Sequence, residues 1–393
     1  MFFQNQGKIR KIINNAVNST NFQELTDNVM EYLKSDVLTE ADELLLNLVF
    51  SDKTTQQDLD SFLEKWDIEA AGGKKSLMLA YFMKMHPELS FSSYVKPRLE
   101  GLLQFYRFKN MKLVSHYLKI GRELNENGIK FLIFKGGCIK HLRPDLPRVM
   151  GDIDILVQEK DFPKVGKIVE QLGYCVNNDI HSIDVHKPDS KEGVMDIHKY
   201  IILESDKEKA FIPDLFKRAK VQNVFGIDAL VPCNEDLVFI SLINMIRNLT
   251  NKTSSAGVPY TLFDCKFLTD SKEDFDWNIV LDNVHKTKTQ MHIYCATQFI
   301  NKIVKGLLPD KVLYDKSCVN SFVNYFIPIV YQRFYLLEMQ SECRKMKIKD
   351  LFSSKEFFVK YWKLKPKYFI SKMKIIKNNP VFAKIILKVF GMM

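Results

Sequence analysis

Hydrophobic residues recur at helical spacing through the first third of the chain. The clearest run extends from Pro97 to Asn125, where apolar side chains return every three or four positions and predict one long helix. Asn127 and Gly128 follow, and this pair suits the positive φ angles at which helices often end. The pattern therefore predicts an N-terminal helical region over residues 1–125.

The pattern changes in the middle of the chain. Phe131–Phe134 is a continuous apolar run of strand length, and residues 152–157 alternate between polar and apolar side chains. A candidate strand follows at Tyr174–Val176, and another is expected at Val194–His198, which Tyr200–Leu203 would continue. Because predicted strands alternate with predicted helices, residues 126–232 are expected to form an α/β (α+β) core with a small mixed β-sheet.

The sequence becomes helical again after this core. Asn234 is a good N-cap for the first helix, and further apolar runs at helical spacing follow. We predict a C-terminal helical domain at residues 233–340 and a basic amphipathic helical tail at residues 341–393. The α/β core is thus flanked by helical regions on both sides.

The net charge of +10 is concentrated in the tail. From Ser341 onward, 14 Lys and Arg stand against 3 Asp and Glu, so the remainder of the chain is close to neutral. This distribution gives no strong indication of nucleic-acid binding. Lysines interleaved with apolar residues suit a helix packed on the body, or a weak association with an anionic membrane, and the sequence leaves both open.

The cysteines and the N-terminus indicate the compartment. The 7 cysteines are scattered without a Cys-x-x-Cys pair, which favours a reducing environment. The N-terminus lacks the apolar core of a signal peptide, and no run reaches the roughly 18 apolar residues of a membrane helix. A cytoplasmic location is expected, with a peripheral position at the inner membrane face as the alternative that the tail allows.

Three features of the central segment point to phosphate chemistry. Gly136 and Gly137 follow the first strand and enter a helix, where glycines let the backbone approach a phosphate. Asp152 and Asp154 lie two positions apart on a strand and so share one face. Such a pair repels itself unless a cation is present, and two Mg²⁺ ions would remove that repulsion and support phosphoryl transfer. Asp196 interrupts another apolar strand and would supply a third carboxylate.

Other interpretations stand beside this one. Each feature alone is ordinary, since most carboxylates on strands are simply solvated. His181, His186 and His198 lie near Asp196, which leaves a zinc site open, although their spacing matches no familiar zinc pattern. His198 shares the face of Asp196, whereas the other two histidines are expected on a loop or on the surface. The conjunction of the three features is what favours a metal-dependent catalytic site.

These residues resemble the uncharacterised bacterial nucleotidyltransferase family of the polymerase-β-like nucleotidyltransferase superfamily. The resemblance rests on four runs and covers roughly residues 95–310. The runs are Phe134-Lys-Gly-Gly137, Leu146–Val157, Leu172-Gly-Tyr174 and Asp196-Ile-His-Lys199.

The resemblance implies an enzyme, a nucleotidyltransferase core that moves a nucleoside monophosphate from an NTP such as ATP to an acceptor hydroxyl or phosphate. It implies Mg²⁺ as the cofactor, with Mn²⁺ as the alternative. Asp152, Asp154 and Asp196 would be both the catalytic residues and the metal ligands, with Asp196 also activating the acceptor. The nucleotide-binding residues would be Lys135, Gly136, Gly137, Arg148 and His198.

One departure from the superfamily bears on turnover. Gly137 stands where relatives usually have Ser, which removes a hydroxyl that could contact phosphate. The alternatives are therefore a catalytically inactive nucleotide-binding or interaction protein on the same fold, and a peripheral membrane protein of a surface-polysaccharide pathway. The sequence does not indicate the acceptor, the base of the NTP or the oligomeric state.

Overall fold

The computed structural model describes residues 22–309, apart from the positions 52, 69–72, 147, 180, 189–192, 203–207, 252–256 and 270–274. All of the described residues belong to a single compact unit. The predicted basic tail at 341–393 and the end of the predicted C-terminal helical domain lie outside the described residues. The four domain boundaries stay predictions.

Within the described residues, five helices precede the sheet. They are α2 (Phe22–Val37), α3 (Glu40–Phe50), α4 (Gln56–Lys65), α5 (Gly73–Met85) and α6 (Val95–Glu126). Thr39 and Thr55 begin α3 and α4 with capping boxes, in which the threonine hydroxyl accepts from a backbone N–H one turn later. The long helix predicted from Pro97 to Asn125 is confirmed as α6, and Gly128 follows it at a φ of 70°.

The central sheet is mixed, as predicted. Its strand order is β3-β4-β5-β2-β1-β7-β6. Two neighbouring pairs, β2 with β5 and β1 with β7, are parallel, and the other pairs are antiparallel. The strands are β1 (Phe131–Phe134), β2 (Ile153–Val157), β3 (Cys175–Asn178), β4 (Ser182–His186), β5 (Gly193–His198), β6 (Lys220–Val224) and β7 (Ile227–Val231).

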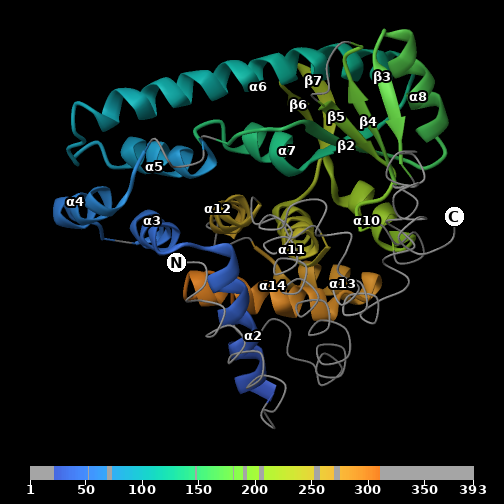
Figure 1. Cartoon of the computed structure of the whole chain (residues 1–393). Helices are drawn as coiled ribbons and strands as arrows, with labels where there is room; N and C mark the ends of the chain where they lie inside the picture. The colour runs from blue at the N-terminus through green and yellow to red at the C-terminus, as the bar shows by residue number, and fades with distance from the viewer. Residues whose placement is uncertain are drawn as a thin grey trace, which may run out of the picture. The chain divides into compact units, whose positions relative to one another are not determined.

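Three helices cover one face of this sheet. They are α6, α7 (Lys135–Leu142) and α8 (Phe162–Gln171), and α6 runs along the sheet in Figure 1. Gly121 of α6 allows close packing, because a Cβ at that position would lie 3.3 Å from the ring of Phe131 and 3.2 Å from Ile227. Side chains alternate along a strand, so the apolar residues of β1 and β2 that face these helices leave the polar residues of β2 on the opposite face.

Up to residue 309, where the described part of the chain ends, four helices follow the sheet. They are α11 (Asn234–Asn251), α12 (Val258–Thr269), α13 (Trp277–Thr287) and α14 (Gln290–Ile303). Helix α11 contacts α12, α13 and α14, and α14 also contacts α2 from the N-terminal region. A mixed α/β core with helices before and after it confirms the predicted fold class. Within the described part of the chain, no helix is both long and apolar enough to cross a bilayer.

Some elements of the core differ from the sequence prediction. The strands β4, β6 and β7 and the short helix α10 (Phe211–Arg218) were not predicted. The expected continuation of β5 through Tyr200 is wrong, because Ile201 and Ile202 donate their backbone N–H groups to the buried carboxylate of Glu208 instead of to a neighbouring strand. The carboxylate satisfies both donors, so the chain turns away from the sheet after Lys199.

Candidate active site

The strand register brings the predicted carboxylates together. Asp154 of β2 pairs directly with Asp196 of the parallel strand β5, and with Phe134 at the end of β1. Residues opposite each other in a sheet project to the same face. The two carboxylates therefore converge where β1 ends and α7 begins, on the face that α6 and α7 do not cover.

His198 links the two carboxylates. Its Nε2 lies 3.1 Å from Asp154 Oδ1 and 2.9 Å from Asp196 Oδ2. Because both partners are acceptors, Nε2 carries the proton and donates to them. The side chains of His198 and Asp154 are 6% and 8% exposed, whereas that of Asp196 is 23% exposed. Asp196 is thus the member of the cluster that remains most open to an incoming group.

Lys135 supplies the positive charge of the cluster. Its Nζ lies 2.5 Å from Asp154 Oδ1 and 3.4 Å from His198 Nε2. The sequence predicted Lys135 as a nucleotide-binding residue, and the structure places its ammonium on the predicted metal ligand. No signal in the sequence could show this contact, because the two residues meet only through the antiparallel pairing of β1 and β2.

Burial and pairing with charged neighbours shift the pKa values in the cluster in opposite directions. Burial alone would raise the pKa of Asp154, but the charge of Lys135 and the hydrogen bond from His198 lower it to about 2. Burial also works against ionisation of Asp196, and His198 again outweighs it and lowers the pKa. For His198, burial and Lys135 favour the neutral ring, yet the hydrogen bonds to both aspartates raise its pKa. The pKa shifts therefore favour the charged forms of Asp154, Asp196 and His198.

Asp152 shows that negative charge is in excess. Burial, and then the charge of Asp154, raises the pKa of Asp152 to about 7. Lys135 and His198 oppose this shift without cancelling it. Two carboxylates two residues apart are thus incompletely neutralised by the side chains around them, which is the repulsion that a bound cation would relieve.

Two observations fit a divalent cation to this cluster. Asp154, Asp196 and His198 each offer a ligand atom, and these atoms lie within 4.8 Å of one another. Asp196 Oδ1 is buried and has no hydrogen-bond partner among the described residues, although a buried carboxylate oxygen normally has one. Asp152 is coupled to the group electrostatically but is not one of these three residues. Its predicted role as a metal ligand stays a prediction.

The two glycines have different surroundings. A Cβ at Gly137 would lie 3.1 Å from Ile133 Cδ1 and 3.2 Å from Ile153 Cγ2, so this glycine lets α7 pack closely on β1 and β2. A Cβ at Gly136 would meet Arg148 and Met150 only at 3.8 Å. Close packing therefore gives a structural reason for a glycine at position 137.

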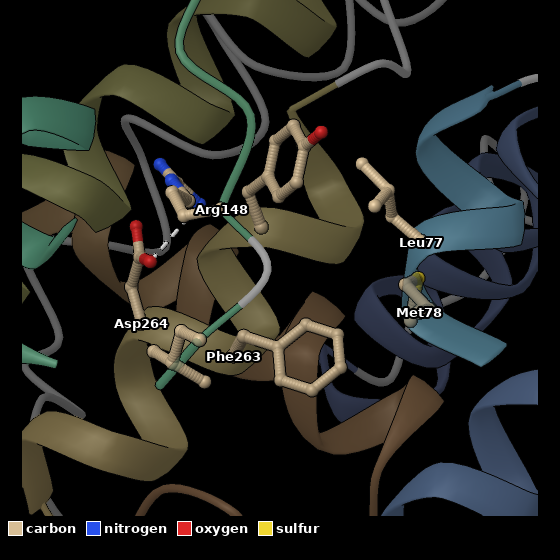
Figure 2. Close-up of a pocket in the computed structure, with 7 residues that line it drawn as sticks. Leu77, Met78, Arg148, Phe263 and Asp264 are labelled. Carbon is tan, nitrogen blue, oxygen red and sulfur yellow. Dashed lines mark ion pairs between the residues drawn. The ribbon is translucent and has the colours of Figure 1, made fainter. Parts of the chain in front are cut away.

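The structure pairs Arg148 with helix α12. Arg148 Nη1 lies 3.0 Å from Asp264 Oδ1, and the two side chains are 12% and 4% exposed. The guanidinium carbon also lies 4.3 Å from the ring centre of Tyr260, a cation–π distance. Figure 2 shows the guanidinium turned toward Asp264, with Leu77 and Met78 of α5 across a cavity from it.

The pair of Arg148 and Asp264 holds the loop that leads to Asp152, and Asn110 holds the same loop from α6. Asn110 of α6 donates to the carbonyl of Arg148 at 2.7 Å and accepts from the backbone N–H of Met150 at 3.1 Å. Burial raises the pKa of Asp264 to about 6 despite the opposing charge of Arg148. The cavity beside the pair measures about 20 Å³, room for about one water molecule. The sequence prediction missed Asn110, Tyr260 and Asp264, which lie far from the loop in sequence.

Of the three histidines considered as zinc ligands, the structure places His198 with the carboxylates and His181 and His186 outside that group. His181 precedes β4, its ring lies 5.8 Å from that of His198, and its Nδ1 lies 3.4 Å from Asp179. His186 ends β4 and is half-buried, so it lies on a strand and not on a loop. Neither residue is part of the group that His198 forms with Asp154 and Asp196.

Comparisons with known proteins place this geometry in a family. The solution structure of the antibiotic-resistance factor ANT(2'')-Ia aligns with 48% of this chain and 96% of that chain, at 16% sequence identity and a TM-score of 0.35. No curated protein matches the chain. The sequence model of one family, described as an uncharacterised nucleotidyltransferase, matches residues 76–305. That span is more than half of the chain and contains every residue of the cluster, and the protein belongs to this nucleotidyltransferase family.

Proposed function

We propose that the protein transfers a nucleoside monophosphate from an NTP to an acceptor hydroxyl or phosphate, with Mg²⁺ as the cofactor. Asp152, Asp154 and Asp196 would hold the metal, and Mn²⁺ is the alternative ion. The observation that carries this proposal is the register of β2 and β5, which sets Asp154 opposite Asp196. A bound divalent cation would neutralise the phosphates and polarise the phosphorus–oxygen bonds.

The residues of the chain would divide the remaining work. An acceptor oxygen attacks the α-phosphorus, and the bond from that phosphorus to the pyrophosphate oxygen breaks. If the acceptor is a hydroxyl, an oxygen of Asp196 takes its proton, because Asp196 is the more exposed of the two paired carboxylates, at 23% against 8% for Asp154. His198 holds the other oxygen of Asp196 at 2.9 Å and so orients the carboxylate.

Phosphate binding would fall to the start of α7. The N–H groups of the first turn of a helix have no partner within it, so those of Gly136 and Gly137 are available to phosphate oxygens. Gly136 has open space around it, which favours close approach. Lys135 would bind the triphosphate, and His198 would contribute through its position between the carboxylates. Arg148 would act by holding the loop before Asp152, since its guanidinium faces Asp264.

The test follows a labelled phosphate of the NTP into the reaction products. The protein is incubated with Mg²⁺, a panel of acceptors and NTPs labelled at either the α- or the γ-phosphate. Nucleotidyl transfer puts the α-label on the acceptor and releases the γ-label as pyrophosphate. Chelation of the metal by EDTA should abolish both signals.

Two results would contradict the proposal in different ways. Binding of NTP with Mg²⁺ but no pyrophosphate release with any acceptor would favour the inactive nucleotide-binding protein. Absence of NTP binding in calorimetry would remove both nucleotide functions. The peripheral membrane alternative concerns the tail, which lies outside the described residues, and remains a prediction.

A further inference from the structure

Lys135 has an unusual backbone conformation. Its φ is 52°, and it stands between the last residue of β1 and the first turn of α7. Residues with a side chain seldom adopt positive φ, and such strain tends to persist where surrounding structure or function requires it. Phe225 and Lys288 have nearly the same φ, so the backbone conformation draws attention to Lys135, and the contacts of its side chain carry the argument.

The side chain lies where a metal ion would have to bind. Its ammonium lies 2.5 Å from Asp154 Oδ1 and 3.4 Å from His198 Nε2, two of the three groups that could ligate one cation. Metal–oxygen bonds of Mg²⁺ are about 2.1 Å long, so an ion bound by this oxygen of Asp154 would lie within a few ångströms of the ammonium. Two cations cannot share the oxygen at that separation without strong repulsion.

We propose that Lys135 is a built-in counter-ion that a divalent cation displaces from Asp154, and that the released ammonium then binds the triphosphate of the incoming nucleotide. The inference rests on the proposed metal site. It gives Lys135 two partners in turn: the carboxylate in the free protein and a phosphate in the loaded one. The exchange breaks and forms only ion pairs, and no covalent bond changes.

This exchange couples the metal to the nucleotide. A metal ion that binds alone must expel the ammonium into a site that offers it no new anion. A metal ion that arrives with an NTP brings that anion with it. Metal affinity should therefore be weak in the absence of nucleotide and higher in its presence, and by linkage the metal should strengthen nucleotide binding by the same factor.

The first test measures Mn²⁺ binding by calorimetry, without nucleotide and with a saturating non-hydrolysable ATP analogue. The variant Lys135→Met removes the charge and keeps much of the length. It should bind Mn²⁺ alone at least about tenfold more tightly than the wild type, and the gain from adding the analogue should shrink. Its affinity for the analogue should fall about tenfold. A gain in Mn²⁺ affinity together with a loss of analogue affinity is expected if Lys135 exchanges one partner for the other.

Lys199→Met is the matched control. Lys199 is next to His198 in sequence, but its Nζ lies over the rings of Phe162 and Tyr200 and makes no ion pair with Asp154 among the described contacts. Its removal measures the general effect of losing one positive charge near the cluster. A gain in Mn²⁺ affinity equal to that of Lys135→Met would overturn the proposal. Circular dichroism confirms that both variants are folded.

A second test measures the unaltered protein and uses the Lys135→Met variant only to assign one signal. Nitrogen NMR of the lysine ammonium groups follows Lys135, whose signal is assigned by its absence from Lys135→Met. The signal should shift when Mg²⁺ and the ATP analogue are added together. It should then resemble that of an ammonium paired with phosphate. A signal that keeps its metal-free position in the loaded protein would overturn the proposal.

The outcomes separate the two levels of inference. If the wild type binds neither Mn²⁺ nor the analogue, the proposed function fails and the exchange fails with it. If the wild type binds both, and Lys135→Met binds Mn²⁺ with unchanged or weaker affinity, only the exchange fails. Tighter Mn²⁺ binding by Lys135→Met, together with weaker analogue binding, supports the exchange.

Discussion

Two groups of charged residues in the described structure differ in how their charges are matched. The cluster of Lys135, Asp154, Asp196 and His198 has an acidic neighbour in Asp152 and an unpartnered oxygen on Asp196. The second group is one guanidinium against one carboxylate, Arg148 with Asp264, beside the ring of Tyr260.

The difference in charge matching suggests different roles for the two groups: the cluster is suited to bind a cation, and the pair supports the fold. The cluster has more negative charge than its own residues neutralise, and such a site gains from a cation that comes from outside. The pair is matched one to one and enclosed, so its role is to tie the loop before β2 to helix α12. Buried charge alone therefore does not single out a candidate site, and the excess of negative charge around Asp152 is what favours the cluster as the proposed metal site.

Removal of a carboxylate from the cluster is expected to have the largest effect, and that effect falls on nucleotidyl transfer. Asp154→Asn should lower nucleotidyl transfer by more than about 100-fold, because loss of groups that merely support a metal ligand already costs about 10–100-fold. The matched control is Asp184→Asn, since Asp184 lies opposite Asp196 on β4 but is exposed and outside the cluster. Initial rates of pyrophosphate release compare the two variants. Equal rates in both would contradict the assignment.

The pair is expected to matter for stability. Asp264→Ala leaves the Arg148 guanidinium buried without its partner and should lower the free energy of unfolding by about 3 kcal/mol. The double variant Arg148→Met with Asp264→Leu removes both charges and should recover most of that loss. Urea denaturation measures both. A double variant that is less stable than Asp264→Ala would show that the pair itself, and not the avoided unpaired charge, stabilises the fold.

The two glycines sharpen the distinction between packing and phosphate binding. Gly137→Ala should destabilise the protein by roughly 1–2 kcal/mol, because its Cβ would crowd Ile133 and Ile153. Gly136→Ala should change stability by less than about 0.5 kcal/mol and act instead on nucleotide affinity. Thermal unfolding and nucleotide titration are the paired measurements. Similar losses of stability in both variants would refute the assignment of packing to Gly137 alone.

The smallest expected effect is the pH dependence of the pair. Burial raises the pKa of Asp264 to about 6, above the ordinary value of 3.8. The folded state therefore binds this proton more tightly than the unfolded state, and protonation stabilises the fold as pH falls through 6 toward 4. The stability of the wild type relative to Asp264→Asn should rise by roughly 1 kcal/mol between pH 7 and pH 5. A relative stability that is constant, or that falls, would contradict this assignment.

Local patterns predicted the elements that position the site. The apolar run of β1, the alternation in β2 and β5 and the helical period of α6 are each visible in a short window of sequence. The family match confirms the predicted resemblance and the predicted class of enzyme. The choice of Asp152, Asp154 and Asp196 as catalytic residues stays a prediction that the register of β2 and β5 supports.

The remaining features depend on contacts between distant segments. Strand β4 has exposed Asp184 at its centre, and four of the ten residues in β6 and β7 are exposed, so their patterns resemble loops. The partnership of Arg148 with Asp264 joins residues more than a hundred positions apart, and neither carries a local signal for the other. Lys135 was assigned to phosphate from its place in a motif, and only the pairing of β1 with β2 revealed its contact with Asp154.

The central claim is that the carboxylates on β2 and β5 hold a divalent metal ion beside the bound nucleotide. Anomalous diffraction from crystals soaked with Mn²⁺ and a non-hydrolysable ATP analogue tests it most directly. The claim predicts an anomalous peak within bonding distance of both Asp154 and Asp196, with the α-phosphate beside it. Absence of a peak while the nucleotide is bound, or a peak bound elsewhere, would contradict it.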